Sequence, residues 1–281
     1  MYDDSPDWRV FFNLLGAMYH SHPLRVDIAG TVESIREITA DLLYTCYNSF
    51  YNLHNMVLAV AGNFEIDAVV DACDRILKPA SPAVVETRPV EEPESVRETR
   101  VEQKLEVASP LFEIGFKGTS ISYRENVLSQ AVGEIVCDLI AGESTALYRE
   151  LYDEGLINTT FDSEVLAGPN YLANLFSGES HDPDEVFRRL KSGVARLQQN
   201  GIDPEDFERA RRAAYGRYVG LYGSIEPMAG ILVIAGLAGF QAYELLDRIS
   251  GLTLNDAQAY LRENFNVDRA AVSIIRGGEE E

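Results

Sequence analysis

The sequence predicts an α+β fold, in which helices and a mixed sheet form a layered sandwich. Helical spacings of apolar residues are interspersed with short strand patterns, without the regular strand–helix repeat of a doubly wound sheet. The composition, 46% hydrophobic and 25% charged, is typical of a globular chain with a sizeable core. At 281 residues, the chain is long enough for two compact units.

A run rich in proline and acidic residues, Lys78 to Arg100, marks the predicted domain boundary. Such a run can neither sustain a helix nor pair in a central strand, so it is expected to cross the surface as a linker. We therefore predict an N-terminal piece at residues 1–80, a linker at 81–100 and a C-terminal domain at 101–281.

The N-terminal piece is predicted to contain four helices and one buried strand. Apolar residues recur at helical spacing after Ser5-Pro6, and Thr31 and Thr39 are typical helix caps. The helices are expected over residues 7–19, from Thr31, from Thr39 to about Phe50, and over residues 67–77. The segment Asn55–Gly62, NMVLAVAG, has the unbroken aliphatic run of a buried strand.

The C-terminal piece mixes strands and helices. Alternating or short apolar runs predict strands at residues 101–107, 111–117, 159–165, 172–177 and 270–275. Helical periodicity predicts helices at residues 126–140, around 187–197, from 205 past 222, and at 254–265. The low-charge stretch Ala229–Phe240 is too short for a membrane span, which needs about 20 residues, and is predicted to be a buried, glycine-rich helix end.

Charge and cysteine content limit the possible partners and compartment. With 24 basic and 45 acidic residues, the net charge is -21, which disfavours binding to nucleic acid and to anionic membrane surfaces. The three cysteines are far apart and lie among apolar neighbours, so no disulfide framework is predicted. A reducing cytoplasm is the expected location.

The histidines do not form a recognisable zinc signature. A zinc hydrolase needs about three protein ligands and an open position for water, and histidine is the commonest ligand. Only His20, His22, His54 and His181 are present, and no H-x-x-E-H occurs. The His20-Ser21-His22 pair lacks the i,i+4 spacing of a metal-binding helix. No metal-binding or catalytic residue is therefore predicted, and the chain alone is expected to be inactive.

Several stretches, in the same order along the chain, resemble pitrilysin/insulinase-type zinc peptidases. The first set is similar to the latter half of that family's first domain: His22-Pro23, Gly30-Thr31, Glu33–Ile35, Thr39–Tyr51 and Asn55–Phe64. The second set is similar to its second domain: Ser144–Leu156 in the substrate-facing segment and Asp203–Ala214 in the helix downstream. Within the family, Met1–Arg9 resembles the bacterial branch near the mitochondrial processing peptidases.

The resemblance implies a pitrilysin-type fold with a partial first domain at residues 1–80 and a complete second domain from about residue 101. In that family an inverted H-x-x-E-H helix and a more distal glutamate hold zinc, and these would precede Met1. The resemblance therefore implies zinc in a full-length parent that carries H-x-x-E-H, and no cofactor in this chain.

The resemblance also suggests where substrate would be held. Active members carry an arginine and a tyrosine on the second-domain segment, where they stabilise the developing oxyanion. Alignment on Gly155-Leu156 places Tyr152 near the arginine position and Asn158 near the tyrosine position, one residue short. Tyr152 and Asn158 are the candidate substrate-binding residues, and an ordinary surface or packing role is the competing interpretation.

Three functional interpretations follow. The chain is expected to be the non-catalytic, C-terminal portion of a processing-protease-like zinc peptidase, in which it helps to enclose and bind peptide. Alternatively, it is an inactive scaffold or partner subunit of an active homologous peptidase, or a core-forming domain without a site. Because the aliphatic strand Met56–Ala61 would lack neighbours, a homodimer or pairing with a homologous subunit is also expected.

Overall fold

The structure is a computed structural model that describes residues 4–82, 85–86, 88 and 90–278. The chain forms two compact units, each assembled from segments that are distant in sequence. The sheet unit consists of Met1–Ala29, Val90–Gly216 and Leu245–Glu281, and the helical unit consists of Gly30–Pro89 and Arg217–Glu244.

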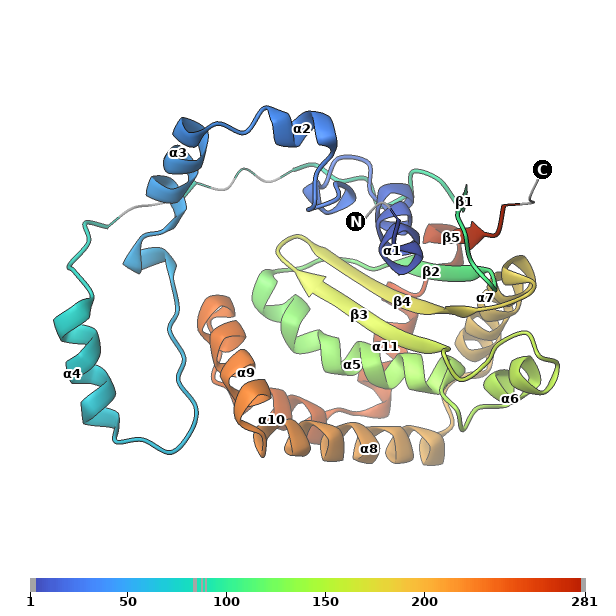
Figure 1. The fold of residues 1–281 in the computed structure, drawn as a ribbon. Helices are drawn as coiled ribbons and strands as arrows, with labels where there is room; N and C mark the ends of the chain where they lie inside the picture. The colour runs from blue at the N-terminus through green and yellow to red at the C-terminus, as the bar shows by residue number, and fades with distance from the viewer. Residues whose placement is uncertain (1–3, 83–84, 87, 89, 279–281) are drawn as a thin grey trace. The chain divides into compact units, whose positions relative to one another are not determined.

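A five-stranded mixed sheet organises the sheet unit (Figure 1). Its strands are β1 (Arg100–Lys104), β2 (Leu111–Lys117), β3 (Asp162–Gly168), β4 (Tyr171–Glu179) and β5 (Ala270–Arg276). They lie in the order β1-β5-β2-β4-β3; β1 pairs parallel to β5, and the other pairs are antiparallel. This mixed sheet with its helices confirms the predicted α+β class.

One face of the sheet is covered by long helices, as Figure 1 shows. These are α5 (Tyr123–Ala141), α7 (Pro183–Asn200) and α11 (Leu254–Asn264). Alternation along β2 sends Phe112, Ile114 and Phe116 to this face, where all three are almost completely buried. The Phe116 ring lies 5.3 Å from that of Phe265, which immediately follows α11. An aromatic core therefore joins the sheet to its helical layer.

The helix α1 (Pro6–Met18) packs against β2 and β5. Its residues Leu14, Leu15 and Met18 are buried in a cluster that includes Leu175 of β4. At Gly115 of β2, an added Cβ would lie 2.3 Å from the Met18 sulfur, so the helix can approach this closely only over a glycine.

The two units do not follow the predicted division at residues 81–100. Although α1 lies far upstream of this run, its apolar side is buried against the sheet, so residues 4–29 fold with the sheet unit. A boundary predicted from sequence marks where proline and charged residues interrupt the pattern, whereas a compact unit is defined by which apolar faces pack together.

The remaining elements include some that the sequence patterns missed. The helix α6 (Ala146–Asp153) and the helix α10 (Glu244–Gly251) had no predicted counterpart, and α8 (Pro204–Tyr222) was predicted. Three short 3₁₀ turns lie at Pro23–Arg25, Leu53–Asn55 and Val267–Arg269. β3 begins three residues later than expected because Asn158 organises a turn there: the backbone N–H of Thr160 donates to its side-chain oxygen.

The helical unit contains α2 (Val32–Arg36), α3 (Ala40–Phe50), α4 (Ile66–Ile76) and α9 (Ile225–Ala238). The predicted caps are confirmed, since Thr31 forms a capping box with Ser34 and Thr39 accepts from the Leu42 N–H. The helix end near residue 238 is also confirmed, with Gly239 at φ 75°. The prediction that this helix end is buried is wrong, because Ala235 alone is buried among the residues of α9.

The predicted strand at Asn55–Gly62 does not form within the described part of the chain. Its side chains are exposed, with Leu58 68% and Val60 43% accessible. Strand pairing needs a neighbouring strand, and no described segment of this unit provides one. The prediction of a buried strand is therefore wrong for this chain, and the aliphatic run remains an extended segment.

The proline-rich run is irregular, as predicted: its described residues between 79 and 99 form neither helix nor strand. The later part of this run is nevertheless attached to α1, because the Glu98 N–H donates to the Ala17 carbonyl. Among the described residues, no single helix is long and apolar enough to cross a membrane; α8 and α9 reach that length and composition only together, across a sharp bend.

Candidate functional site

The four histidines are each engaged locally. His20 Nε2 lies 3.4 Å from Ser95 Oγ, His22 Nδ1 accepts from the Leu24 N–H, and His54 Nε2 lies 2.9 Å from the Ala80 carbonyl. His181 Nδ1 lies 3.0 Å from the Gly155 carbonyl. Across the residues that the structure describes, no three His, Cys, Asp or Glu side chains are grouped so that they could hold a metal ion.

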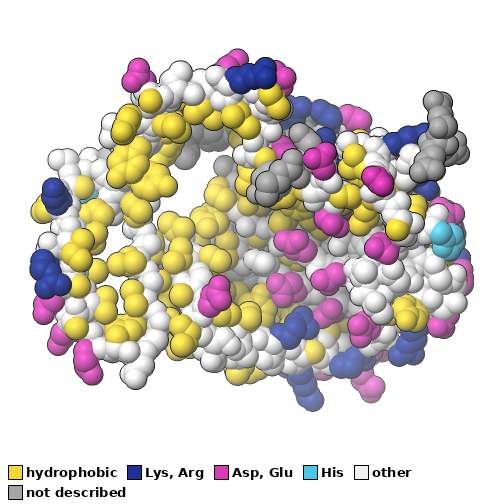
Figure 2. Space-filling model, viewed as in Figure 1, with side chains coloured by type: hydrophobic (Ala, Val, Ile, Leu, Met, Phe, Trp, Pro, Cys, Tyr) yellow, Lys and Arg dark blue, Asp and Glu magenta, His cyan; other side chains and the backbone are white. Residues whose placement is uncertain are grey.

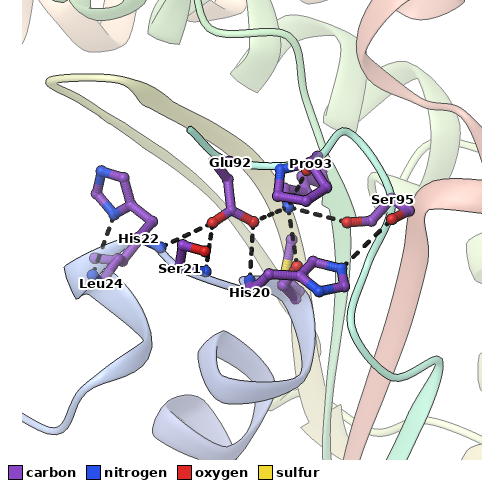
Figure 3. Close-up of polar contacts among 9 residues, drawn as sticks. His20, Ser21, His22, Leu24, Glu92, Pro93 and Ser95 are labelled. Carbon is purple, nitrogen blue, oxygen red and sulfur yellow. Dashed lines mark hydrogen bonds and ion pairs between the residues drawn. The ribbon is translucent and has the colours of Figure 1, made fainter. Parts of the chain in front are cut away.

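The His20-Ser21-His22 pair has a different role, which Figure 3 shows. The backbone N–H groups of these three residues all donate to the Glu92 carboxylate, at 2.7–2.9 Å. The fourth donor to this carboxylate is the Lys117 ammonium of β2, at 2.5 Å. Glu92, from the predicted linker, therefore ties the loop after α1 to the sheet.

Lys117 is the centre of a clamp, which consists of Lys117, Glu92 and the backbone amides of residues 20–22. Its side chain is 6% exposed, and its Nζ also donates to the backbone carbonyls of Met18, Pro93 and Ser95. Burial lowers the pKa of Lys117, and the hydrogen bond to Glu92 opposes that shift. Burial raises the pKa of Glu92, but the hydrogen bonds from Lys117 and the three amides outweigh it and lower the pKa to about 2. Glu92 is thus held as a carboxylate beside an ammonium.

A second acid, Glu113 on β2, is 7% exposed and forms no ion pair with a described residue. It lies opposite Ser273, whose hydroxyl has no hydrogen-bond partner among the described residues. Burial raises the pKa of Glu113 to about 8, and the nearby charges of Glu164 and Asp7 add to this shift. The same face of β2 therefore holds an ionised Glu92–Lys117 pair and a carboxyl that is largely protonated at neutral pH.

The predicted substrate-binding residue Tyr152 lies near the end of α6 and is 45% exposed. Thr145 caps this helix by accepting from the Tyr148 N–H, and Gly155, at φ 69°, turns the chain after it. The Tyr148 and Tyr152 rings are stacked, with centroids 5.9 Å apart and planes 11° apart. The segment thus presents a two-tyrosine aromatic surface.

Asn158, the other predicted residue, organises the turn before β3. Its side-chain nitrogen donates to the Glu179 carboxylate at 2.9 Å, and its oxygen accepts from both the N–H and the hydroxyl of Thr160. The structure gives Tyr152 and Asn158 separate partners, and their role in substrate binding stays a prediction. Neither side chain supplies the positive charge that an arginine at residue 152 would bring.

A pocket of about 400 Å³ adjoins this segment and is large enough for one side chain of a peptide. It lies where α5, α6, α8 and the start of β3 meet, and its wall includes Tyr148 and Phe161. Arg209 also lines it, donating to Asp206 and to the Ser144 hydroxyl. Sequence reasoning missed these residues, although the aromatic residues Tyr148, within the resembling segment Ser144–Leu156, and Phe161, after it, were a usable signal.

Comparison with known proteins identifies the family. Residues 37–214 match the description "Peptidase M16 inactive domain".

The chain belongs to the M16 peptidase family.

Two further comparisons agree with this assignment. The chain is 30% identical over 277 residues to "Uncharacterized zinc protease YmfH" of Bacillus subtilis, covering 97% of this chain and 64% of that relative. It is similar to the solved "putative M16-like peptidase from Alicyclobacillus acidocaldarius", with 31% identity, a TM-score of 0.92, and coverage of 99% of this chain and 67% of that one. The resemblance to pitrilysin-type zinc peptidases is confirmed.

More distant structures share the M16 fold. A protease from Helicobacter pylori is 15% identical with a TM-score of 0.81, and it is covered over 67% of its length. The chain thus spans about two thirds of the length of YmfH and of the Alicyclobacillus and Helicobacter structures. Its curated relatives are named zinc proteases, which supports zinc as the metal of this family.

Proposed function

We propose that this chain is the non-catalytic part of an M16 zinc peptidase and that it helps to enclose and bind a peptide substrate. The observation that carries this proposal is the surface of residues 144–163: two stacked tyrosines, Tyr148 and Tyr152, beside a pocket of about 400 Å³. Stacked aromatic rings offer rigid apolar area at low entropic cost, which suits recognition of an extended peptide. Catalysis would require zinc ligands and a general base, and the sequence contains no H-x-x-E-H.

Peptide binding by the 281-residue chain tests this proposal. Fluorescence anisotropy with labelled, unstructured peptides is expected to show binding without cleavage. Tyr152→Ala should weaken that binding about fivefold, because one aromatic contact contributes roughly 1 kcal/mol. Tyr215→Ala, which removes another partly exposed tyrosine of the sheet unit, is the matched control and should leave affinity unchanged.

Two results would contradict the proposal. One is an equal loss of peptide affinity in both variants, which would indicate that exposed tyrosines bind peptide nonspecifically. The other is that the chain, shown to be folded, binds no peptide in a varied set.

The alternative is an inactive scaffold or partner subunit that pairs with a homologous, catalytically complete chain. Exposed apolar side chains of the helical unit favour this reading. In that case, mixing the chain with an active homologue should change the partner's hydrolysis rate, and Tyr152→Ala should leave that change intact.

We also propose that the protein acts in the cytoplasm. Its three cysteines are free thiols, which is consistent with a reducing compartment.

A further inference from the structure

A small pocket beside α1 gathers three of the chain's basic side chains. Its volume is about 300 Å³, and the residues that line it include Arg9, Phe12, Gly16, Arg25, Asp27 and Arg97. Three guanidinium groups and one carboxylate give this lining a formal charge of +2, whereas the whole chain carries -21. Figure 2 shows acidic side chains spread over the face of the molecule that it presents. The pocket is therefore a local concentration of positive charge on an acidic protein.

Three segments of the sheet unit form the walls of this pocket. The helix α1 contributes Arg9, Phe12 and Gly16, which lie on one side of the helix because their spacing is helical. Arg25 ends the 3₁₀ turn that follows α1, and Arg97 belongs to the proline-rich run. Residues that are far apart in sequence are thus brought to one place by the fold.

The clamp around Lys117 fixes two of these walls. Glu92 accepts from the backbone amides of residues 20–22, which lead into the 3₁₀ turn. Lys117 donates to the carbonyls of Pro93 and Ser95, which lead to the third wall. The pocket is therefore formed before any ligand arrives, and such preorganisation lowers the entropic cost of binding.

The arginines keep donors for a ligand. The Arg25 side chain forms no hydrogen bond or ion pair with a described residue. Arg97 donates from Nη2 to the Glu98 carboxylate at 2.7 Å, in a pair whose side chains are 38% and 51% exposed. A guanidinium has five N–H donors, so this one contact leaves most of those on Arg97 unused.

The one acid among the described lining residues, Asp27, has partners of its own. Its carboxylate accepts from the Trp8 indole N–H at 2.9 Å and from the Ala29 backbone N–H at 2.8 Å. The Arg9 guanidinium lies 3.8 Å from it. Asp27 therefore holds the wall in place and offsets only one of the three positive charges.

Gly16 gives independent evidence that the pocket is kept open. A glycine inside a helix is less stable than an alanine, and close packing is a common reason for its presence. Close packing does not explain this glycine, because an added Cβ would meet only the Arg25 carbonyl oxygen, at 3.9 Å, which is an ordinary contact. The absence of a side chain instead leaves room at the pocket wall.

We propose that this pocket binds a phosphate group, either as inorganic phosphate or as part of a small phosphate ester. A phosphate monoester carries a charge of about -1.5 to -2 at neutral pH, which matches the +2 of the lining. The planar guanidinium fork suits phosphate oxygens, and Phe12 supplies an apolar wall for the organic part of an ester. A volume of about 300 Å³ lies at the lower end of the range for ligand pockets, which favours a small molecule.

Isothermal titration calorimetry of the 281-residue chain in phosphate-free buffer tests this proposal. Three probes are compared: inorganic phosphate, phenyl phosphate and benzoate. We expect saturable one-to-one binding of phenyl phosphate, and at least tenfold weaker binding of benzoate, which has the same ring but a single charge. Phenyl phosphate that binds at least tenfold more tightly than inorganic phosphate would assign the site to an ester, and equal affinities would assign it to inorganic phosphate.

Charge variants locate the site. Arg25→Gln should weaken the binding of phenyl phosphate at least tenfold, because a charge-assisted bidentate contact is lost. Arg212→Gln is the matched control: it removes the same charge from a side chain on α8 that is 79% exposed, and it should leave the affinity unchanged.

A second pair of variants changes the volume of the pocket and keeps its charge. Gly16→Met should fill the space and weaken binding at least tenfold, whereas Gly16→Ala should change the affinity less than twofold. Alanine and methionine both favour helix more than glycine does, so neither variant should lower the melting temperature.

Four results would overturn the proposal. They are benzoate binding as tightly as phenyl phosphate, an equal loss in Arg25→Gln and Arg212→Gln, undiminished binding in Gly16→Met, and no saturable binding of phosphate or phenyl phosphate by the folded chain. Tyr152→Ala should leave the binding of phenyl phosphate unchanged, so these outcomes are independent of peptide binding at residues 144–163.

Discussion

The sheet unit and the helical unit carry the same kinds of local sequence signal, but in the described residues only the sheet unit forms paired strands. Both begin helices at threonine or serine caps, such as Thr39 in the helical unit and Ser122 in the sheet unit. In the sheet unit, aliphatic strands find neighbours, and Ile114 and Ile274 are completely buried. In the helical unit, Leu58 has equally suitable chemistry and remains 68% exposed. A capped helix forms its hydrogen bonds locally, whereas an extended segment becomes a strand only when a neighbouring strand is present to pair with it.

The largest effect of a single substitution on stability is expected at the clamp around Lys117, in the sheet unit. Lys117→Met would leave the partly buried Glu92 without its cation and remove a donor from three carbonyls, so the free energy of unfolding should fall by about 3 kcal/mol. Denaturant unfolding monitored by the fluorescence of Trp8, in the sheet unit, measures this loss.

Arg188→Met is the control for that experiment. It breaks an ion pair with Glu185 in which Arg188 is 64% exposed, and it should cost less than about 0.5 kcal/mol. Similar losses in both variants would show that the clamp is no more important than a surface ion pair.

A smaller effect is expected from the buried carboxyl of Glu113. Its pKa is raised to about 8 in the folded state from an ordinary value near 4.5, so the folded state holds the proton more tightly than the unfolded state. Stability should therefore decrease as pH rises from about 4.5 to 8. Glu113→Gln removes this penalty and should be more stable than the wild type by about 1 kcal/mol at pH 7, with no difference near pH 4.

Thermal unfolding at a series of pH values tests this expectation. Glu150→Gln, at an exposed position on α6, is the control that corrects for the change in net charge. If Glu113→Gln and Glu150→Gln shift the melting temperature equally at every pH, then burial of Glu113 does not set the pH dependence.

Much of the fold was predictable because its signals are local. Thr31 and Thr39 mark helix starts by capping chemistry, and the strand at residues 111–117 follows from its apolar run between turn residues. The missed helix α6 spans only eight residues, so its helical pattern, although regular, repeats over barely two turns.

The candidate site was less predictable, because it depends on long-range contacts. Lys117 and Glu92 are 25 residues apart and appear in sequence as an ordinary strand residue and a linker residue. Tyr152 was found through a family motif, whereas the pocket beside it also needs Arg209 from α8, which only the folded chain brings near. The Asn55–Gly62 pattern contributed to the family resemblance, but this segment pairs with none of the described strands.

Native-state hydrogen exchange of the isolated 281-residue chain tests the contrast between the units most directly. We expect strong protection of the amides of Ile114 and Ile274, which lie in the paired strands β2 and β5, and exchange close to the unprotected rate for Val57–Val60. Comparable protection of residues 57–60 and of β2 in a chain that sediments as a monomer would contradict this expectation. That result would mean that the aliphatic segment has found its strand partners within this chain.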